Sequence, residues 1–257
     1  VGEGLEEFLE KPLESLAQSA VKFELLKQSG MKKLKFRERN IFEGHDDHDD
    51  HGHGKKKKDD HDDHDDHDHD KKAKKEDHDD HGHDDHGHGH GEFDPHIWLD
   101  PMNAKIIIKK VTNQLSKLDK DNSSTYKSNS KKALKEIDNL IKQVKSDINK
   151  DAKVVVFHDA YQYFEKRFDV NIIGALTVNT DVLPGAEQLA EIREVIEHEK
   201  VTCVLSEPQF NPDIVKTIAN DTNINMGVLD PLGAKLDKGK TLYFNLISNI
   251  SSSLKNC

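Results

Sequence analysis

Residues 45–90 concentrate side chains that bind metal ions. This segment holds 14 of the 17 histidines in the chain, together with 17 Asp, one Glu and eight Lys. Its repeating unit is His-Asp-Asp, with His-Gly variants, and Ala73 is its only apolar side chain. Imidazole nitrogens and carboxylate oxygens at this density suit borderline divalent metals, above all zinc. The pattern predicts weak accessory metal sites at His45, His48, His51, His53, His61, His64, His67, His69, His78, His81, His83, His86, His88 and His90.

The same segment cannot build a hydrophobic core, so we expect residues 44–91 to form a disordered, solvated insert. It also carries most of the charge. Its net charge is -10, against -11 for the whole chain, so the remaining residues are nearly neutral. A basic surface for nucleic acid is therefore not expected. The chain also has no apolar run of about 18 residues that would span a membrane.

Three residues outside the insert are candidate ligands of a more specific site. His96 lies in a predicted loop, and His158 and Asp230 each follow a predicted strand directly. Two imidazoles and a carboxylate are a common first shell of zinc. A metal-binding histidine also needs its second nitrogen held, and Asp94 and Asp159 lie near enough in sequence to be considered for that role. The alternative is that each candidate is an isolated polar residue with its own hydrogen bonds.

Catalysis has little support in this sequence. It contains no His-Glu-x-x-His, Gly-x-Ser-x-Gly or phosphate-binding loop. The remaining histidine, His198, lies between two glutamates in a predicted helix, and we assign it no role. The interpretation is a binding protein that is not an enzyme.

The elements that must position these residues alternate after residue 150. Apolar runs predict strands at 154–157, 171–176, 201–205 and 226–229, with helices at 160–168, 186–199, 212–223 and 240–255. Strands that alternate with helices predict a parallel sheet covered on both faces. Ligands of such sheets bind at the carboxyl ends of the strands, where His158 and Asp230 are expected.

The first part of the chain is predicted to be mainly helical. Apolar spacing predicts a helix over 3–29, kinked or divided at Pro12, and a short strand-like piece follows at 35–42. Asp100 and Pro101 are typical of a helix cap and first helical residue. Residues 122–150 predict a long helix with a narrow apolar stripe that could join two lobes.

The two cysteines leave two alternatives open. Cys203 lies in a predicted buried strand and Cys257 is the last residue. Both could be free thiols. Paired, they would tie the chain end to the core, stabilise the fold by about 4 kcal/mol and indicate an oxidising compartment.

Several motifs, in one order, resemble a known family. Residues 94–101 and 157–164 resemble the two hallmarks of the metal-binding proteins of bacterial zinc and manganese ABC importers. Shorter matches follow at 184–186, 207–210 and 229–233. The histidine-rich insert and the two cysteines narrow the resemblance to the zinc-uptake (ZnuA) branch.

The resemblance implies two α/β lobes, each with a parallel sheet flanked by helices, with zinc in the cleft between them. The lobes would be residues 1–121 and 151–257, joined by one rigid helix at 122–150. By position, His96 and His158 resemble the ligands of the first and second lobe, and Asp230 the acidic cleft residue. Cys203 and Cys257 match the disulfide of the zinc branch.

The first histidine ligand of the family lies upstream of the segment where this chain begins, and no histidine precedes His45. We therefore expect a chain truncated at its N-terminus, without that ligand and without the opening strands of the first lobe.

The function implied is a periplasmic or otherwise extracytoplasmic, membrane-associated, monomeric protein that captures zinc and delivers it to an ABC permease. The alternatives are a manganese-binding relative, and a metal-binding surface adhesin or storage lipoprotein. Dense histidine favours zinc over manganese.

Overall fold

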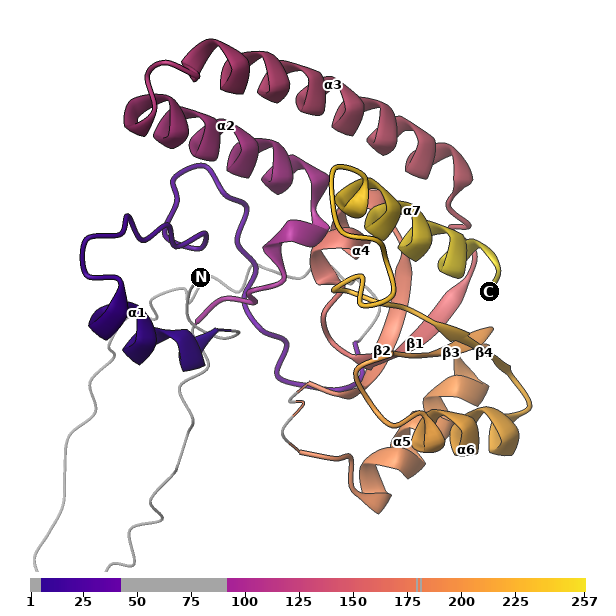
Figure 1. Cartoon of the computed structure of the whole chain (residues 1–257). Coiled ribbons are helices and arrows are strands. Elements are labelled where there is room, and N and C mark those ends of the chain that lie inside the picture. The colour runs from indigo at the N-terminus through magenta and orange to yellow at the C-terminus, as the bar shows by residue number, and fades with distance from the viewer. Residues whose placement is uncertain (1–5, 43–91, 179, 181) are drawn as a thin grey trace, which may run out of the picture. The chain divides into compact units, whose positions relative to one another are not determined.

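A computed structural model of the chain describes residues 6–42, 92–178, 180 and 182–257 (Figure 1). The insert, with its 14 predicted accessory histidines, lies outside the described residues. Among the described helices, none is both long and apolar enough to cross a lipid bilayer.

The second half of the chain is built on a parallel sheet of four strands, in the order β2-β1-β3-β4. The strands are β1 (Lys153–His158), β2 (Asn171–Thr177), β3 (Cys203–Ser206) and β4 (Asn225–Val228). Each lies where the apolar runs predict it to within two residues. His158 is the last residue of β1, so its side chain lies at the carboxyl edge of the sheet.

Helices cover both faces of this sheet. Alternate residues of β1 point to opposite sides, so Val154 and Val156 belong to one apolar cluster and Val155 and Phe157 to another. The first cluster includes residues of α4 (Gln162–Phe168) and α7 (Leu242–Lys255). The second includes residues of α5 (Ala186–His198) and α6 (Asp213–Thr222). The predicted α/β architecture with a parallel sheet is confirmed.

Two long helices precede the sheet and pack against each other, α2 (Pro101–Leu118) and α3 (Ser123–Asp147) (Figure 1). Asp100 caps α2 as predicted, accepting a hydrogen bond from the Met102 backbone N–H at 2.8 Å. It also accepts two hydrogen bonds from Arg167 of α4, each 2.7 Å long. The start of α2 is therefore anchored to the helix that follows His158.

The helix predicted over 3–29, kinked or divided at Pro12, is wrong in its extent. The described residues of this range hold only a 3-10 turn (Glu7–Leu9) and the short helix α1 (Glu10–Leu16), which contains Pro12. Phe8, Leu16 and Val21 are 73%, 86% and 55% exposed, so the apolar stripe gains little from packing. An amphipathic pattern without a packing partner rarely sustains a long helix in water.

The strand-like piece at 35–42 makes two isolated antiparallel bridges, Lys35 with Phe93 and Ile41 with Gly174 of β2. A Cβ on Gly174 would lie 2.7 Å from the Asn40 carbonyl oxygen, so only glycine allows this close approach. The expected parallel sheet of the first lobe does not occur in the described residues of 1–121, where these bridges are the only β pairing.

The cysteines form a disulfide, with Cα atoms 5.5 Å apart. It joins β3 to Cys257, two residues beyond α7, and so fastens this segment to an inner strand of the sheet. The pairing implied by the family resemblance is confirmed.

Replacing both cysteines, Cys203→Ser and Cys257→Ser, should lower the free energy of unfolding by about 4 kcal/mol, because the unfolded chain loses a 54-residue cross-link. Urea unfolding followed by circular dichroism measures this. Reductant should destabilise the original chain and leave the double variant unchanged. Equal stability of the two chains without reductant would contradict the prediction.

Candidate metal centre

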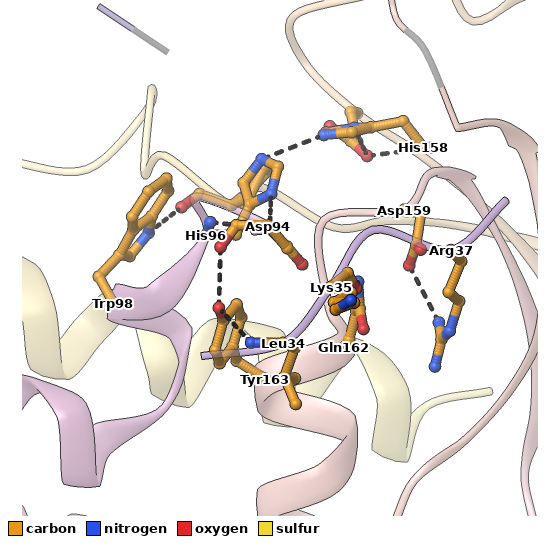
Figure 2. A network of polar contacts seen from close by, with 12 residues as sticks. Leu34, Lys35, Arg37, Asp94, His96, Trp98, His158, Asp159, Gln162 and Tyr163 are labelled. Atoms are coloured by element: carbon orange, nitrogen blue, oxygen red, sulfur yellow. Dashed lines mark hydrogen bonds and ion pairs between the residues drawn. The ribbon is translucent and has the colours of Figure 1, made fainter. Parts of the chain in front are cut away.

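Two histidines from distant parts of the chain face each other. His158 ends β1, and His96 lies just before the 3-10 turn Ile97–Leu99 that leads into α2. Their Nε2 atoms are 3.5 Å apart, although the residues are separated by 62 positions (Figure 2). Both are largely buried, with 8% and 9% of their surface exposed. The structure therefore brings together two of the three predicted ligands.

The spacing of the two nitrogens suits a bound zinc ion. Zinc lies about 2.0–2.1 Å from an imidazole nitrogen. An ion bound by both Nε2 atoms, which are 3.5 Å apart, would have an N–Zn–N angle of about 117°, close to the tetrahedral angle. The aromatic rings around the pair add an apolar wall. The ring centroids of Trp98 and His96 are 5.4 Å apart, and those of Phe210 and His158 are 5.7 Å apart.

A buried carboxylate holds the other nitrogen of each imidazole. Asp94 Oδ1 lies 2.7 Å from His96 Nδ1 and also accepts the His96 backbone N–H at 2.8 Å. Glu207 Oε1 lies 2.7 Å from His158 Nδ1. These contacts favour a proton on each Nδ1, which leaves the Nε2 lone pairs facing each other. Both rings are thus oriented as metal ligands.

Sequence reasoning named Asp94 as a possible partner but missed Glu207. The signal was present, because Glu207 directly follows β3, whose neighbour β1 ends at His158. Parallel neighbours end at the same edge of the sheet, so their following residues meet. What the sequence does not give is the strand order that makes β1 and β3 neighbours.

Asp159, the other suggested partner, forms an ion pair with Arg37, whereas His158 Nδ1 is held by Glu207. Arg37 lies 3.0 Å from Asp159 Oδ1 and 2.5 Å from Glu165 Oε2. Burial raises the pKa of Asp159 to about 6, and Arg37 opposes part of that rise. Arg37 therefore fastens the segment before the insert to Asp159 and to α4, which follow His158 (Figure 2).

Asp230, the third predicted ligand, is not grouped with the two histidines in the described residues. In the described part of the chain, no three His, Cys, Asp or Glu side chains are grouped closely enough to hold a metal ion. The Asp230 Oδ1 atom accepts hydrogen bonds from Gln209 Nε2 at 2.8 Å and from the backbone N–H groups of Leu232 and Gly233 at 3.1 and 2.9 Å. Its role as a ligand stays a prediction.

The other fifteen histidines, His198 and the 14 of the insert, are not part of this centre as the structure describes it. His198 is 87% exposed on α5, as expected for a solvated helix residue. The accessory histidines of the insert fall outside the described residues.

Comparison with known proteins decides the family. The protein-family model described as zinc-uptake complex component A, periplasmic, matches residues 1–257. The chain belongs to this family. It is 44% identical to the high-affinity zinc uptake system protein ZnuA of Brucella abortus (strain 2308), covering all of this chain and 75% of that protein. The ZnuA of Yersinia pestis is 36% identical over 66% of this chain and 54% of that protein.

Solved structures share the fold. A ZnuA crystal structure aligns with 64% of this chain and 60% of its own length, with a TM-score of 0.58 and 24% identity. A Zn(II)-bound variant of AdcAII from Streptococcus pneumoniae aligns with a TM-score of 0.55 and 27% identity, covering 67% of this chain and 65% of that one. The chain thus spans about three fifths to two thirds of these structures.

Removing the carboxylate behind His158 should weaken metal binding. We expect Glu207→Gln to lower zinc affinity about 10- to 100-fold, because the His158 ring loses the charged acceptor that orients it and raises its basicity as a ligand. Competition with a zinc-chelating dye measures the affinity. The exposed Glu194→Gln is the matched control and should bind like the original chain. An unchanged affinity in Glu207→Gln would refute the role of this carboxylate.

Zinc binding should change the fluorescence of Trp98, the only tryptophan in the chain, because its ring lies 5.4 Å from that of His96. A zinc titration at the emission maximum tests this directly. The change should saturate at one equivalent of tightly bound zinc and be lost in His96→Ala. A response that survives this substitution would place the tight site elsewhere.

Proposed function

We propose that this chain captures zinc as cargo between His96 and His158 and delivers it to a membrane permease of the ABC type. The observation that supports this most strongly is the pair of inward-facing Nε2 atoms at 3.5 Å, each imidazole held from behind by a buried carboxylate. The two carboxylates also place negative charge near the ion. No catalytic step is assigned to the chain.

We propose Asp230 as a third ligand, with water completing the shell. Its three hydrogen bonds all fall on Oδ1, so Oδ2 is the atom offered to the metal. Binding through this oxygen requires a movement of the loop that holds Asp230, because Asp230 is not grouped with the two histidines in the described residues. Zinc would then have two nitrogen ligands and one oxygen ligand, a common set for this ion.

The two histidines belong to two proposed lobes. Residues 1–121 would carry His96, residues 151–257 would carry His158 and Asp230, and the helix within 122–150 would join them. Metal held between two lobes can be released when the lobes separate, because each lobe alone offers too few ligands. The stiff helix favours a small separation instead of a wide hinge motion.

We propose that the protein works as a monomer in the periplasm, associated with the membrane that holds its permease. The support is the family description and the names of the relatives, which are zinc uptake proteins. The insert would collect zinc at weak sites of its own. Its histidines favour zinc as the cargo, with manganese as the alternative.

A second candidate is a role in surface adhesion. Two similar structures, 27% and 26% identical to this chain, are laminin-binding proteins of Streptococcus pyogenes and Streptococcus agalactiae. The latter is described as bifunctional, with adhesin and metal transporting activity. Normal zinc uptake in cells that lack the protein, together with loss of adhesion, would favour this candidate.

Calorimetry on three variants tests the zinc site. Replacing both ligands, His96→Ala and His158→Ala, should abolish the tight site, whereas deleting residues 44–91 should remove only weak sites. The exposed His198→Ala is the control and should bind zinc normally. If the tight site disappears with the insert and survives the double substitution, the proposal is wrong.

A further inference from the structure

Trp98 connects two parts of the metal centre that are far apart in sequence. It lies two residues after His96, and its indole N–H donates a hydrogen bond to the carbonyl oxygen of Pro231 at 2.9 Å. Pro231 directly follows Asp230 and is buried. One side chain therefore spans from the turn that carries His96 to the loop that carries Asp230.

The turn that carries Trp98 is itself held in place by several hydrogen bonds. The Tyr243 hydroxyl of α7 donates to the Trp98 carbonyl oxygen at 2.9 Å. The Asn103 side chain donates to the Ile97 carbonyl oxygen at 3.2 Å, and the Leu99 N–H donates to the His96 carbonyl oxygen at 3.1 Å. The backbone on both sides of Trp98 is thus held independently of the Pro231 contact.

The loop that receives the hydrogen bond has a fixed internal shape. Asp230 Oδ1 accepts the N–H groups of Leu232 and Gly233, which closes a tight turn around Pro231. Gly233 has φ +71°, a conformation that favours glycine. Because the turn is closed on itself, the Pro231 carbonyl and the Asp230 carboxylate move together. A contact that holds Pro231 also sets where Asp230 lies.

We propose that Trp98 is a positioning residue of the metal centre, which holds the Asp230 loop against the His96 turn through Pro231. The inference rests on the proposed zinc site and goes beyond it by naming what controls its third ligand. Trp98 itself does not touch the metal. Its N–H holds the Asp230 loop beside the His96 turn, so that the loop can swing away from the centre only when this hydrogen bond opens.

The consequence is kinetic as well as thermodynamic. Loss of the N–H frees the loop and leaves a buried carbonyl oxygen without its donor. One hydrogen bond of this kind corresponds to about a three- to tenfold change in an equilibrium. Trp98→Phe should therefore speed zinc dissociation about three- to tenfold, measured by stopped-flow transfer to a chelator.

A double-mutant cycle separates positioning from a general structural effect. If Trp98 acts through Asp230, then Trp98→Phe should have little further effect on zinc dissociation once Asp230→Asn has removed the charged ligand. Additive effects would overturn the proposal, as would normal dissociation from Trp98→Phe. Thermal unfolding of the metal-free variants shows whether the fold has been lost.

If Trp98→Phe does not fold, an isosteric analogue at position 98 serves as the second variant. Trp98 is the only tryptophan in the chain, so no other position is affected. Site-specific incorporation of 3-benzothienylalanine exchanges the N–H for sulfur and keeps the ring size. Faster zinc dissociation is again expected, and an unchanged rate overturns the proposal. Failure of the zinc site itself is distinguished by tight binding that survives His96→Ala with His158→Ala.

Discussion

The candidate metal centre depends on two hydrogen bonds between imidazole and carboxylate. A neutral imidazole has two tautomers, and only one leaves the Nε2 lone pair free for a metal. Asp94 and Glu207 select that tautomer in His96 and His158 by accepting from Nδ1 at 2.7 Å. Both carboxylates are buried, and a buried charge is costly unless it is compensated. At the proposed site, a divalent cation between the histidines would supply that compensation.

A short chain of hydrogen bonds fixes how the two histidines face each other. The Tyr163 hydroxyl of α4 donates to the Asp94 carbonyl oxygen at 2.8 Å and accepts the Leu34 N–H at 3.0 Å. Asp94 in turn donates its own N–H to the Leu34 carbonyl oxygen at 2.9 Å. Because α4 begins four residues after His158, the loop of His96 is fastened close to the end of β1. The residues before and after the insert are therefore part of the frame of the metal centre (Figure 2).

The reliability of sequence reasoning differed along the chain for physical reasons. Most strands and helices after residue 150 were predicted because their apolar pattern reflects the packing they make. The exception is the edge strand β4, which was predicted although Met226 and Val228 are 46% and 48% exposed. The helix predicted over 3–29 forms as an α-helix only at Glu10–Leu16, because an apolar period sustains a long helix only where a partner covers it, and Phe8 and Leu16 remain exposed. Glu207 was missed for a different reason, since its role depends on β3 lying beside β1. Strand order is a property of the folded sheet that local patterns do not encode.

The sequence by itself determined the chemistry of this protein. Residue types and motif spacing indicated a metal, favoured zinc, and singled out His96 and His158 from a chain in which most histidines lie elsewhere. The sequence also placed His158 at the end of a strand, because a buried strand is recognised from a local run of apolar residues. Only the tertiary structure decided that the two Nε2 atoms meet at 3.5 Å, which carboxylate stands behind each ring, and that Trp98 reaches Pro231. These contacts join residues separated by 62 and 133 positions, and such distances are set by packing of the whole fold.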